Sequence, residues 1–140
     1  MREPPLHVKI LHPLAWVIEP LAGEPSLVVR PMFGCRAVYL RGRMVLCLAA
    51  KAEPWRGVLV PTERAHHAAL IADRPALRPH PVLPKWLYLP EEAPSFERDS
   101  AWLVARVRAG DPCLGIEPGS DRKQPNRKLK RATSSSRSRP

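Results

Sequence analysis

Short apolar runs separated by turn residues are the main pattern of this sequence. Aliphatic and aromatic residues dominate each run, and glycine or proline stands near most of the run ends, as is typical of β-strands. The runs lie at residues 27–30, 37–40, 44–49, 58–60 and 86–89. Arg41-Gly42 separates the second run from the third. A glycine between two such runs predicts a β-hairpin at this point.

Helical spacing predicts a long helix near the end of the folded region, from residue 95 or 96 to 109. Five residues fall on one face of this helix: Phe96, Ser100, Leu103, Val104 and Val107. Gly110 follows them, and glycine at this place commonly ends a helix.

An earlier stretch has the same spacing but carries a conflicting residue. Leu14, Val17, Ile18 and Leu21 follow helical spacing, yet Pro20 lies within them. Proline lacks a backbone N–H, so a helix here should kink or end near residue 19.

A third helix is predicted after residue 61. Thr62 is suited to the N-cap position, and Glu63 complements the positive end of a helix. Ala65, Ala68, Ala69 and Ala72 then form a stripe of small residues, which would let the helix lie close against a sheet. Residues 74–84 contain four prolines and are predicted to be a loop.

The order of these elements favours an α+β domain, with an antiparallel sheet of about four to five strands and helices packed on it. Leu6, Val8 and Ile10 alternate with polar residues, which permits a further short extended segment. The domain is predicted to cover residues 1–118. Residues 119–140 hold one leucine and no other large apolar side chain, so they are predicted to be a disordered basic tail.

The formal net charge of +10 is concentrated in that tail. From residue 121 onward the tail has one acidic residue, Asp121, and eight basic ones, so only about +3 remains on the rest of the chain. The eight are Arg122, Lys123, Arg127, Lys128, Lys130, Arg131, Arg137 and Arg139. Clustered Lys and Arg attract phosphate without sequence preference, so these residues are candidate nucleic-acid contacts. A tail that only increases solubility remains the alternative.

The segment Arg-Pro-Met-Phe-Gly at residues 30–34, followed by the hairpin, resembles the N-terminal domain of the TfoX/Sxy family of bacterial competence regulators. That family has an Arg-x-Met-Phe-Gly-Gly corner and then a hairpin with a glycine turn. The resemblance covers roughly residues 11–116. It favours a short, kinked first helix, and it is supported by Tyr88-Leu89-Pro90, which is similar to the family's aromatic strand.

The resemblance implies a non-enzymatic regulatory or interaction module, close to transcriptional or competence regulation, with a protein partner that the sequence does not name. Two departures stand out. Cys35 replaces the second glycine and would be strained if that position required a positive φ. The basic tail also stands where full-length competence regulators have a second, helical domain.

The corner itself has two interpretations. Arg30, Met32, Phe33 and Gly34 are candidate binding residues, with the planar Arg30 guanidinium able to hold carbonyls, a carboxylate or a phosphate. The alternative, which the sequence favours, is structural: the Met and Phe side chains fill the core while the glycine makes a tight turn.

Other residue types give no catalytic or metal-binding pattern. His66 and His67 are adjacent and would point about 100° apart on a helix, so no metal or cofactor is predicted. Cys35, Cys47 and Cys113 are far apart, which argues against a disulfide framework, and Cys35 beside Arg36 is the one cysteine worth testing as a nucleophile.

Features of targeting and membrane insertion are also missing from the sequence. The first residues contain two prolines and no long apolar core, which is unlike a signal peptide. No apolar run approaches the roughly 20 residues of a membrane span. We therefore expect a cytoplasmic protein without a membrane partner. No P-loop, Rossmann or nucleophile-elbow motif suggests an enzyme, so an enzyme of unrecognised type that uses the corner and Cys35 is the last-ranked alternative.

Overall fold

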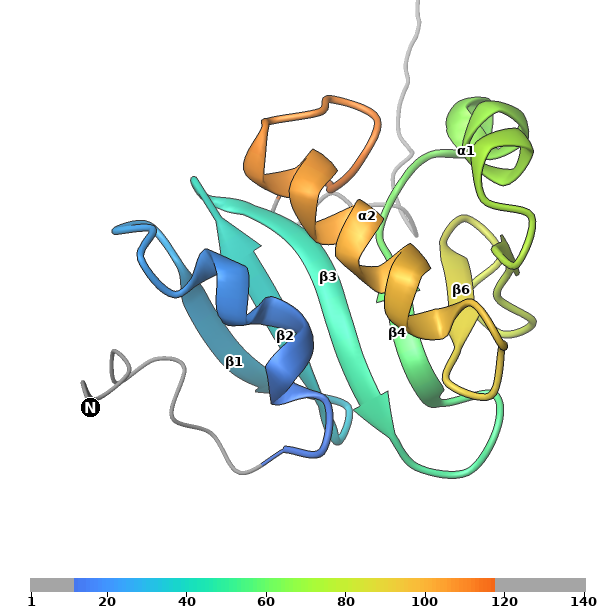
Figure 1. The fold of residues 1–140 in the computed structure, drawn as a ribbon, viewed down its shortest axis with the longest axis horizontal. Coiled ribbons are helices and arrows are strands. Elements are labelled where there is room, and N and C mark those ends of the chain that lie inside the picture. The colour runs from blue at the N-terminus through green and yellow to red at the C-terminus, as the bar shows by residue number, and fades with distance from the viewer. Residues whose placement is uncertain (1–11, 118–140) are drawn as a thin grey trace, which may run out of the picture.

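The computed structural model of the protein describes residues 12–117 (Figure 1). The elements in chain order are η2 (Ala15–Leu21), β1 (Val28–Met32), β2 (Cys35–Leu40), β3 (Arg43–Ala50), β4 (Arg56–Val60), η3 (Arg64–His66), α1 (His67–Asp73), β5 (Arg78–Pro79), β6 (Leu87–Pro90) and α2 (Phe96–Arg108). All neighbouring strands are antiparallel, in the order β1-β2-β3-β4-β6-β5.

The predicted α+β class is confirmed, and the sheet has six strands where about four to five were expected. The additional strand is β5, which is only two residues long and lies in the proline-rich segment predicted as loop. The strands β1 to β4 and β6 all lie within one or two residues of the apolar runs that predict them.

The helices η2 and α2 lie side by side across one face of the sheet (Figure 1). Between them and the strands is the larger core, which includes Ile18 and Leu21 from η2 and Leu103 and Val104 from α2. The predicted apolar face of α2 is buried as expected. The first helix is the short one expected, a 3-10 helix that contains Pro20.

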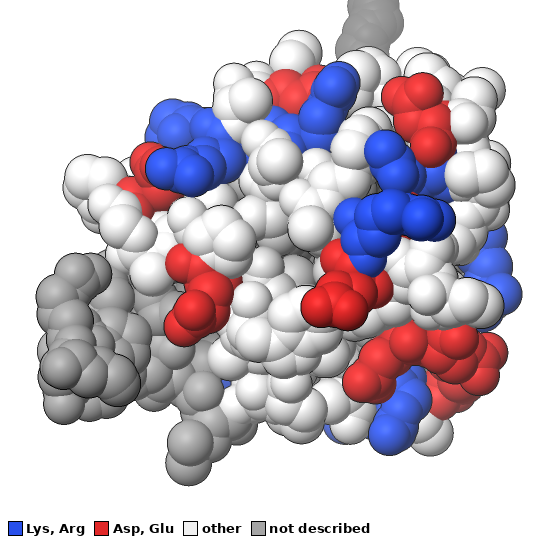
Figure 2. Space-filling view, in the orientation of Figure 1, with Lys and Arg blue, Asp and Glu red and all other residues white. Residues whose placement is uncertain are grey.

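The helix-covered face carries charges of both signs. Figure 2 shows Lys and Arg side chains beside Asp and Glu side chains over this surface. Several of these charges pair across elements, as Arg108 on α2 does with Glu24, at 3.2 Å between Nε and Oε2. This face is therefore electrostatically mixed.

The helix after residue 61 differs from its prediction. Thr62 is buried, and its hydroxyl donates to the Cys113 carbonyl at 2.6 Å instead of capping a helix. The helical turns begin later, with η3 and then α1. The stripe of small residues, from Ala65 to Ala72, is exposed, and Leu70 is the side chain that packs into the core. A leucine buries more apolar area than an alanine, which explains why it sets the orientation.

Two predicted segments lie outside the described residues: the extended segment from Leu6 to Ile10 and the basic tail, with all eight of its cations. None of the helices between residues 12 and 117 has the length and apolar character of a membrane span.

Candidate binding groove on the open face of the sheet

The sheet face opposite η2 and α2 has a small core of its own. Alternate residues of the central strands point to this side, among them Ala37, Cys47, Leu59 and Tyr88, and all four are buried. The helices η2 and α2 do not cover this face, and η3 reaches it with Arg64. Instead, the loop before β6, which ends at Trp86, and the segment at Ile116 cover part of it.

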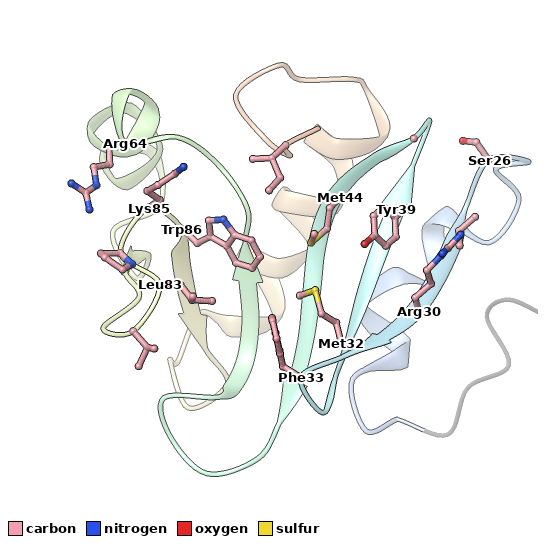
Figure 3. Close-up of a pocket in the computed structure, with 15 residues that line it drawn as sticks. Ser26, Arg30, Met32, Phe33, Tyr39, Met44, Arg64, Leu83, Lys85 and Trp86 are labelled. Atoms are coloured by element: carbon pink, nitrogen blue, oxygen red, sulfur yellow. The ribbon is translucent and has the colours of Figure 1, made fainter. Parts of the chain in front are cut away.

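Between these covering segments and β1 lies a groove of about 1010 Å³. Its lining is mainly apolar and comes from β1 to β3, the start of η3, the loop before β6 and the segment at Ile116 (Figure 3). The apolar lining residues are Val28, Met32, Phe33, Tyr39, Met44, Val82, Leu83, Pro84, Trp86 and Ile116. A concave apolar surface of this size is typical of a ligand or partner site.

A bulge in the β2–β3 pair brings Met44 to the groove. Val38 pairs with Leu46, but Tyr39 pairs with Met44, so Val45 is an extra residue on β3. Val45 and Leu46 consequently both join the helix-side core, while Met44 faces the groove beside Tyr39. Bulges commonly redirect a side chain in this way.

Phe33 occupies a position that packing does not explain. It is 76% exposed, so the expectation that it fills the core is wrong, whereas Met32 is partly buried against the groove-side core. Phe33 and Gly34 form the two-residue turn between β1 and β2, with φ of 52° and 78°. Such turns favour Asn-Gly, because a phenylalanine with positive φ is sterically disfavoured. Figure 3 places Phe33 beside Met32 at the groove.

Cys35 avoids the strain anticipated at the second glycine position. The positive φ values belong to Phe33 and Gly34, and Cys35 is an ordinary buried residue of β2. Burial raises the pKa of the Cys35 thiol above its usual value. It therefore lacks the lowered pKa that a nucleophilic cysteine needs.

The turn between β2 and β3 has the same backbone conformation but a visible structural role. Arg41 and Gly42 have φ of 53° and 81°. The Arg41 side chain donates from Nη2 to the carbonyls of Val107, at 3.2 Å, and Arg108, at 3.0 Å. A cation at the C-terminal end of α2 satisfies carbonyls that have no helical partner.

Exposed large hydrophobic side chains gather at the groove. Among the described residues four are exposed: Trp16, Val28, Phe33 and Val82. Three of the four line the groove, and Trp16 lies away from it on η2, against Phe96 of α2. Single exposed apolar residues are common, but their concentration at one concave site indicates a binding surface.

The charged residues of the lining are all basic. Arg30, Arg64 and Lys85 contribute to the groove, and the lining contains no Asp or Glu. The Arg30 guanidinium lies 5.8 Å from the centre of the Tyr39 ring, within cation–π range. Figure 3 shows Arg64 and Lys85 on one side of the apolar floor and Arg30 on the other.

A buried histidine holds the loop wall of the groove in place. His80 is fully buried, and its Nδ1 accepts hydrogen bonds from the backbone N–H groups of Val82, at 3.0 Å, and Leu83, at 3.1 Å. Its Nε2 lies 2.8 Å from the Pro54 carbonyl oxygen and so carries the proton. Burial lowers the pKa of His80, which favours this neutral form.

Tyr88 lies beneath the wall and is held in a second network. Its ring packs edge-on against His80, with 5.2 Å between centroids. Its hydroxyl accepts a hydrogen bond from the Arg56 N–H at 2.8 Å and lies 2.9 Å from Glu53 Oε1. Burial raises the pKa of Tyr88 to about 12, so its hydroxyl stays protonated.

The segment at Ile116 closes one end of the groove. Ile116 forms a two-way backbone bridge with Met44, with both N···O distances at 3.0 Å. Arg43 donates from Nη2 to the carbonyls of Leu114 and Gly115, at 3.3 and 2.7 Å, and pairs with Glu117. The described chain therefore ends next to the groove.

The structure brings together only part of the predicted site. Arg30, Met32 and Phe33 line the groove, while Gly34 forms the turn. The other groove residues were missed by sequence reasoning: they include Tyr39 and Met44 from the hairpin and Arg64, Val82, Leu83, Lys85 and Trp86 from later segments. The one available signal was the apolar pair Val82-Leu83 inside a proline-rich loop.

Catalytic and metal-binding candidates have ordinary structural partners or stand apart. His67 Nε2 lies 2.8 Å from the Lys85 carbonyl. Asp111 accepts from the Cys113 N–H at 2.9 Å, as a turn-forming aspartate does. Residues 12–117 contain no cluster of three or more His, Cys, Asp or Glu side chains able to hold a metal ion.

Comparison of the chain with family models, with curated proteins and with solved structures finds no match in any of the three.

Proposed function

We propose that this protein is a non-catalytic interaction module that binds a partner in the groove on the open face of its sheet. We further propose a regulatory role, related to that of the N-terminal domain of TfoX/Sxy competence regulators. The second proposal rests on the Arg30–Gly34 segment and on the order of elements that follows it.

The observation that carries the binding proposal is the position of Phe33. Its ring is exposed and its backbone adopts a conformation that phenylalanine disfavours. Neither burial nor turn preference favours this residue, and backbone strain concentrates at functional sites. A contact with a partner gives a reason for both features.

The sheet edges support a groove rather than strand addition as the mode of binding. The edge strands β1 and β5 contain Pro31 and Pro79 respectively, and β5 has only two residues. Proline offers no N–H to an added strand, and short edge strands with proline are typical protection against edge-to-edge pairing.

A neutral apolar dye such as Nile red tests whether the groove binds apolar groups. We expect the full chain to enhance and blue-shift the dye's fluorescence, and Phe33→Ser to weaken this binding severalfold. Trp16→Ser is the matched control, because it removes an exposed aromatic ring outside the groove. Circular dichroism should confirm that both variants fold. Equal losses in the two variants would contradict the proposal.

The second candidate function is weak, sequence-independent binding of nucleic acid by the tail. The eight cations between residues 122 and 139 support it, because counterion release gives affinity without base recognition. This function does not require the groove.

A further inference from the structure

We infer that the partner bound in the groove is an acidic peptide segment of another protein, with apolar side chains flanked by Asp or Glu. This inference rests on the proposed function of the groove and specifies the chemistry of the occupant.

The groove differs in charge from the rest of the described chain. Residues 12–117 contain 13 Lys and Arg and 11 Asp and Glu, so the two signs are nearly balanced. The groove lining departs from this balance, with three basic side chains and no acidic one. The helix-covered face has both signs (Figure 2). The positive charge is therefore a property of the groove and not of the whole domain.

Two of these cations have no carboxylate partner among the described residues. Neither Arg30 nor Arg64 forms an ion pair with any described residue, and both are exposed. By contrast, Arg41, Arg43, Arg74 and Arg106 each hold a carboxylate or a helix end. Arg30 and Arg64 are therefore available to a carboxylate on a partner, and arginine can hold it with two parallel hydrogen bonds.

The positions of the three cations also favour an acidic peptide. They stand on opposite sides of an apolar floor formed by Tyr39, Met44 and Trp86 (Figure 3). This arrangement matches a linear ligand whose centre is apolar and whose two flanks are anionic. Charge complementarity of this kind mainly sets specificity and the rate of association.

Three other occupants fit less well. The chain's own tail has eight cations and one carboxylate from Asp121 onward, so it has the same sign as the groove. The grooves of two copies facing each other would juxtapose like charges, which is unfavourable. Nucleic acid would satisfy Arg30 and Arg64 with phosphate, but an apolar floor adds little to phosphate binding.

The test is a selection of random peptides on the full chain, with removal of those that also bind Phe33→Ser. Because the variant keeps the tail, this step discards peptides held only by tail cations. We expect the enriched sequences to combine at least two large apolar residues with an excess of Asp and Glu. Enrichment of neutral or basic sequences would overturn the inference.

Charge reversal then tests the arginines with a labelled selected peptide. We expect Arg30→Glu combined with Arg64→Glu to weaken binding at least about tenfold at low salt, and the loss to shrink at high salt because exposed charges are screened. Arg98→Glu is the control for each groove arginine reversed singly, since Arg98 is exposed on α2 and its reversal makes the same change of charge outside the groove. A loss with Arg98→Glu equal to that with Arg30→Glu or Arg64→Glu alone would contradict the inference.

The experiments can contradict the acidic-peptide inference and the proposed groove function independently. If no peptide prefers the wild type but Nile red still distinguishes Phe33→Ser from Trp16→Ser, the groove binds apolar groups and the acidic-peptide inference is wrong. If the dye does not distinguish them either, the groove proposal itself is wrong.

Discussion

At the scale of single residues, Phe33 and Arg41 occupy the same kind of turn for different reasons. Each precedes a glycine, and each has a φ near 50°. The Arg41 side chain donates hydrogen bonds to carbonyls at the end of α2, so this contact compensates for the disfavoured backbone conformation of Arg41. The Phe33 ring makes no such contact with the helix side and stands at the groove.

We predict that Phe33→Asn makes the protein more stable while weakening groove binding. Asparagine tolerates the left-handed conformation better than phenylalanine, so the free energy of unfolding should rise by up to about 1 kcal/mol. Urea denaturation would measure it. Arg41→Asn makes the same backbone change but loses two hydrogen bonds, and should lower stability. A loss of about 3–5 kcal/mol in Phe33→Asn, as expected for a core ring, would contradict the placement.

His80 predicts a pH dependence of stability. The pKa of His80 is lowered in the folded protein by burial, from an ordinary value of 6.5, although the Pro54 carbonyl and Glu53 act in the opposite direction. The unfolded chain therefore binds the proton more readily, so this stability is complete above pH 6.5 and declines as the pH falls below it. For one such group, the free energy of unfolding changes by at most about 1.4 kcal/mol per pH unit.

The variant His80→Asn isolates this effect. An asparagine oxygen can accept the N–H groups of Val82 and Leu83 in place of Nδ1 but does not titrate. Thermal melts between pH 7 and pH 5 should show a smaller loss of Tm than in the wild type. The remaining slope includes His12, whose pKa burial also lowers. Identical slopes would mean that His80 has no part in the pH response.

At the scale of elements, sequence reasoning succeeded where local chemistry decides the structure. The Arg41-Gly42 turn fixed the β2–β3 hairpin, and the apolar spacing of α2 gave its buried face. Sequence reasoning failed where a contact with a residue far along the chain decides the structure. Thr62 has the chemistry of an N-cap but donates to Cys113, which lies 51 residues away. The bulge at Val45 reverses the face of Met44, and the pattern of the strand does not reveal it.

The candidate site was less predictable than the fold for the same reason. Arg30, Met32 and Phe33 were identified because they are consecutive with a turn. Arg64, Lys85 and Trp86 join them only because the strand order places β6 beside β4 and the loop before β6 over the open face. Their proximity depends on topology, which no local pattern encodes.

The junction of α1 and α2 offers a prediction at this scale. Asp99 in the first turn of α2 is 3% exposed, accepts from the Ser95 hydroxyl at 2.6 Å and pairs with Arg74 at 3.3 Å. Asp99→Ala would leave Arg74 without its carboxylate and should cost about 2–3 kcal/mol, less than a fully buried pair because Arg74 is partly exposed. Chemical denaturation would measure this loss.

Asp73→Ala is the matched control for that experiment. Asp73 is exposed at the end of α1 and forms no ion pair among residues 12–117. Removing a negative charge from the C-terminal end of a helix should be neutral or slightly stabilising. A similar loss in both variants would mean that the Arg74–Asp99 pair contributes nothing specific.

At the scale of the whole molecule, we predict that the tail is required for nucleic-acid binding but not for folding. Deleting residues 119–140 should change the free energy of unfolding by less than about 1 kcal/mol, because the tail has one leucine and no other large apolar side chain. The same deletion should abolish weak binding to duplex DNA. Because eight cations are available, the slope of log K against log salt should not exceed about −7 in magnitude.

Denaturation curves and titrations of labelled duplex at several salt concentrations provide the two measurements. DNA binding that survives the deletion would place the contact within residues 1–118. In that case the arginines around the hairpin, Arg30, Arg36, Arg41 and Arg43, would be the first to substitute.

The bridge between Ile116 and Met44 has a consequence for how groove and tail would act together. It anchors the chain at the end of the groove, and Arg122 follows Glu117 by five residues, a reach of no more than about 18 Å. Because Arg122 is tethered within this range of the groove, its effective concentration there is on the order of millimolar. An acidic occupant of the groove would therefore compete with nucleic acid for the tail cations that follow Glu117, and each ligand would inhibit binding of the other.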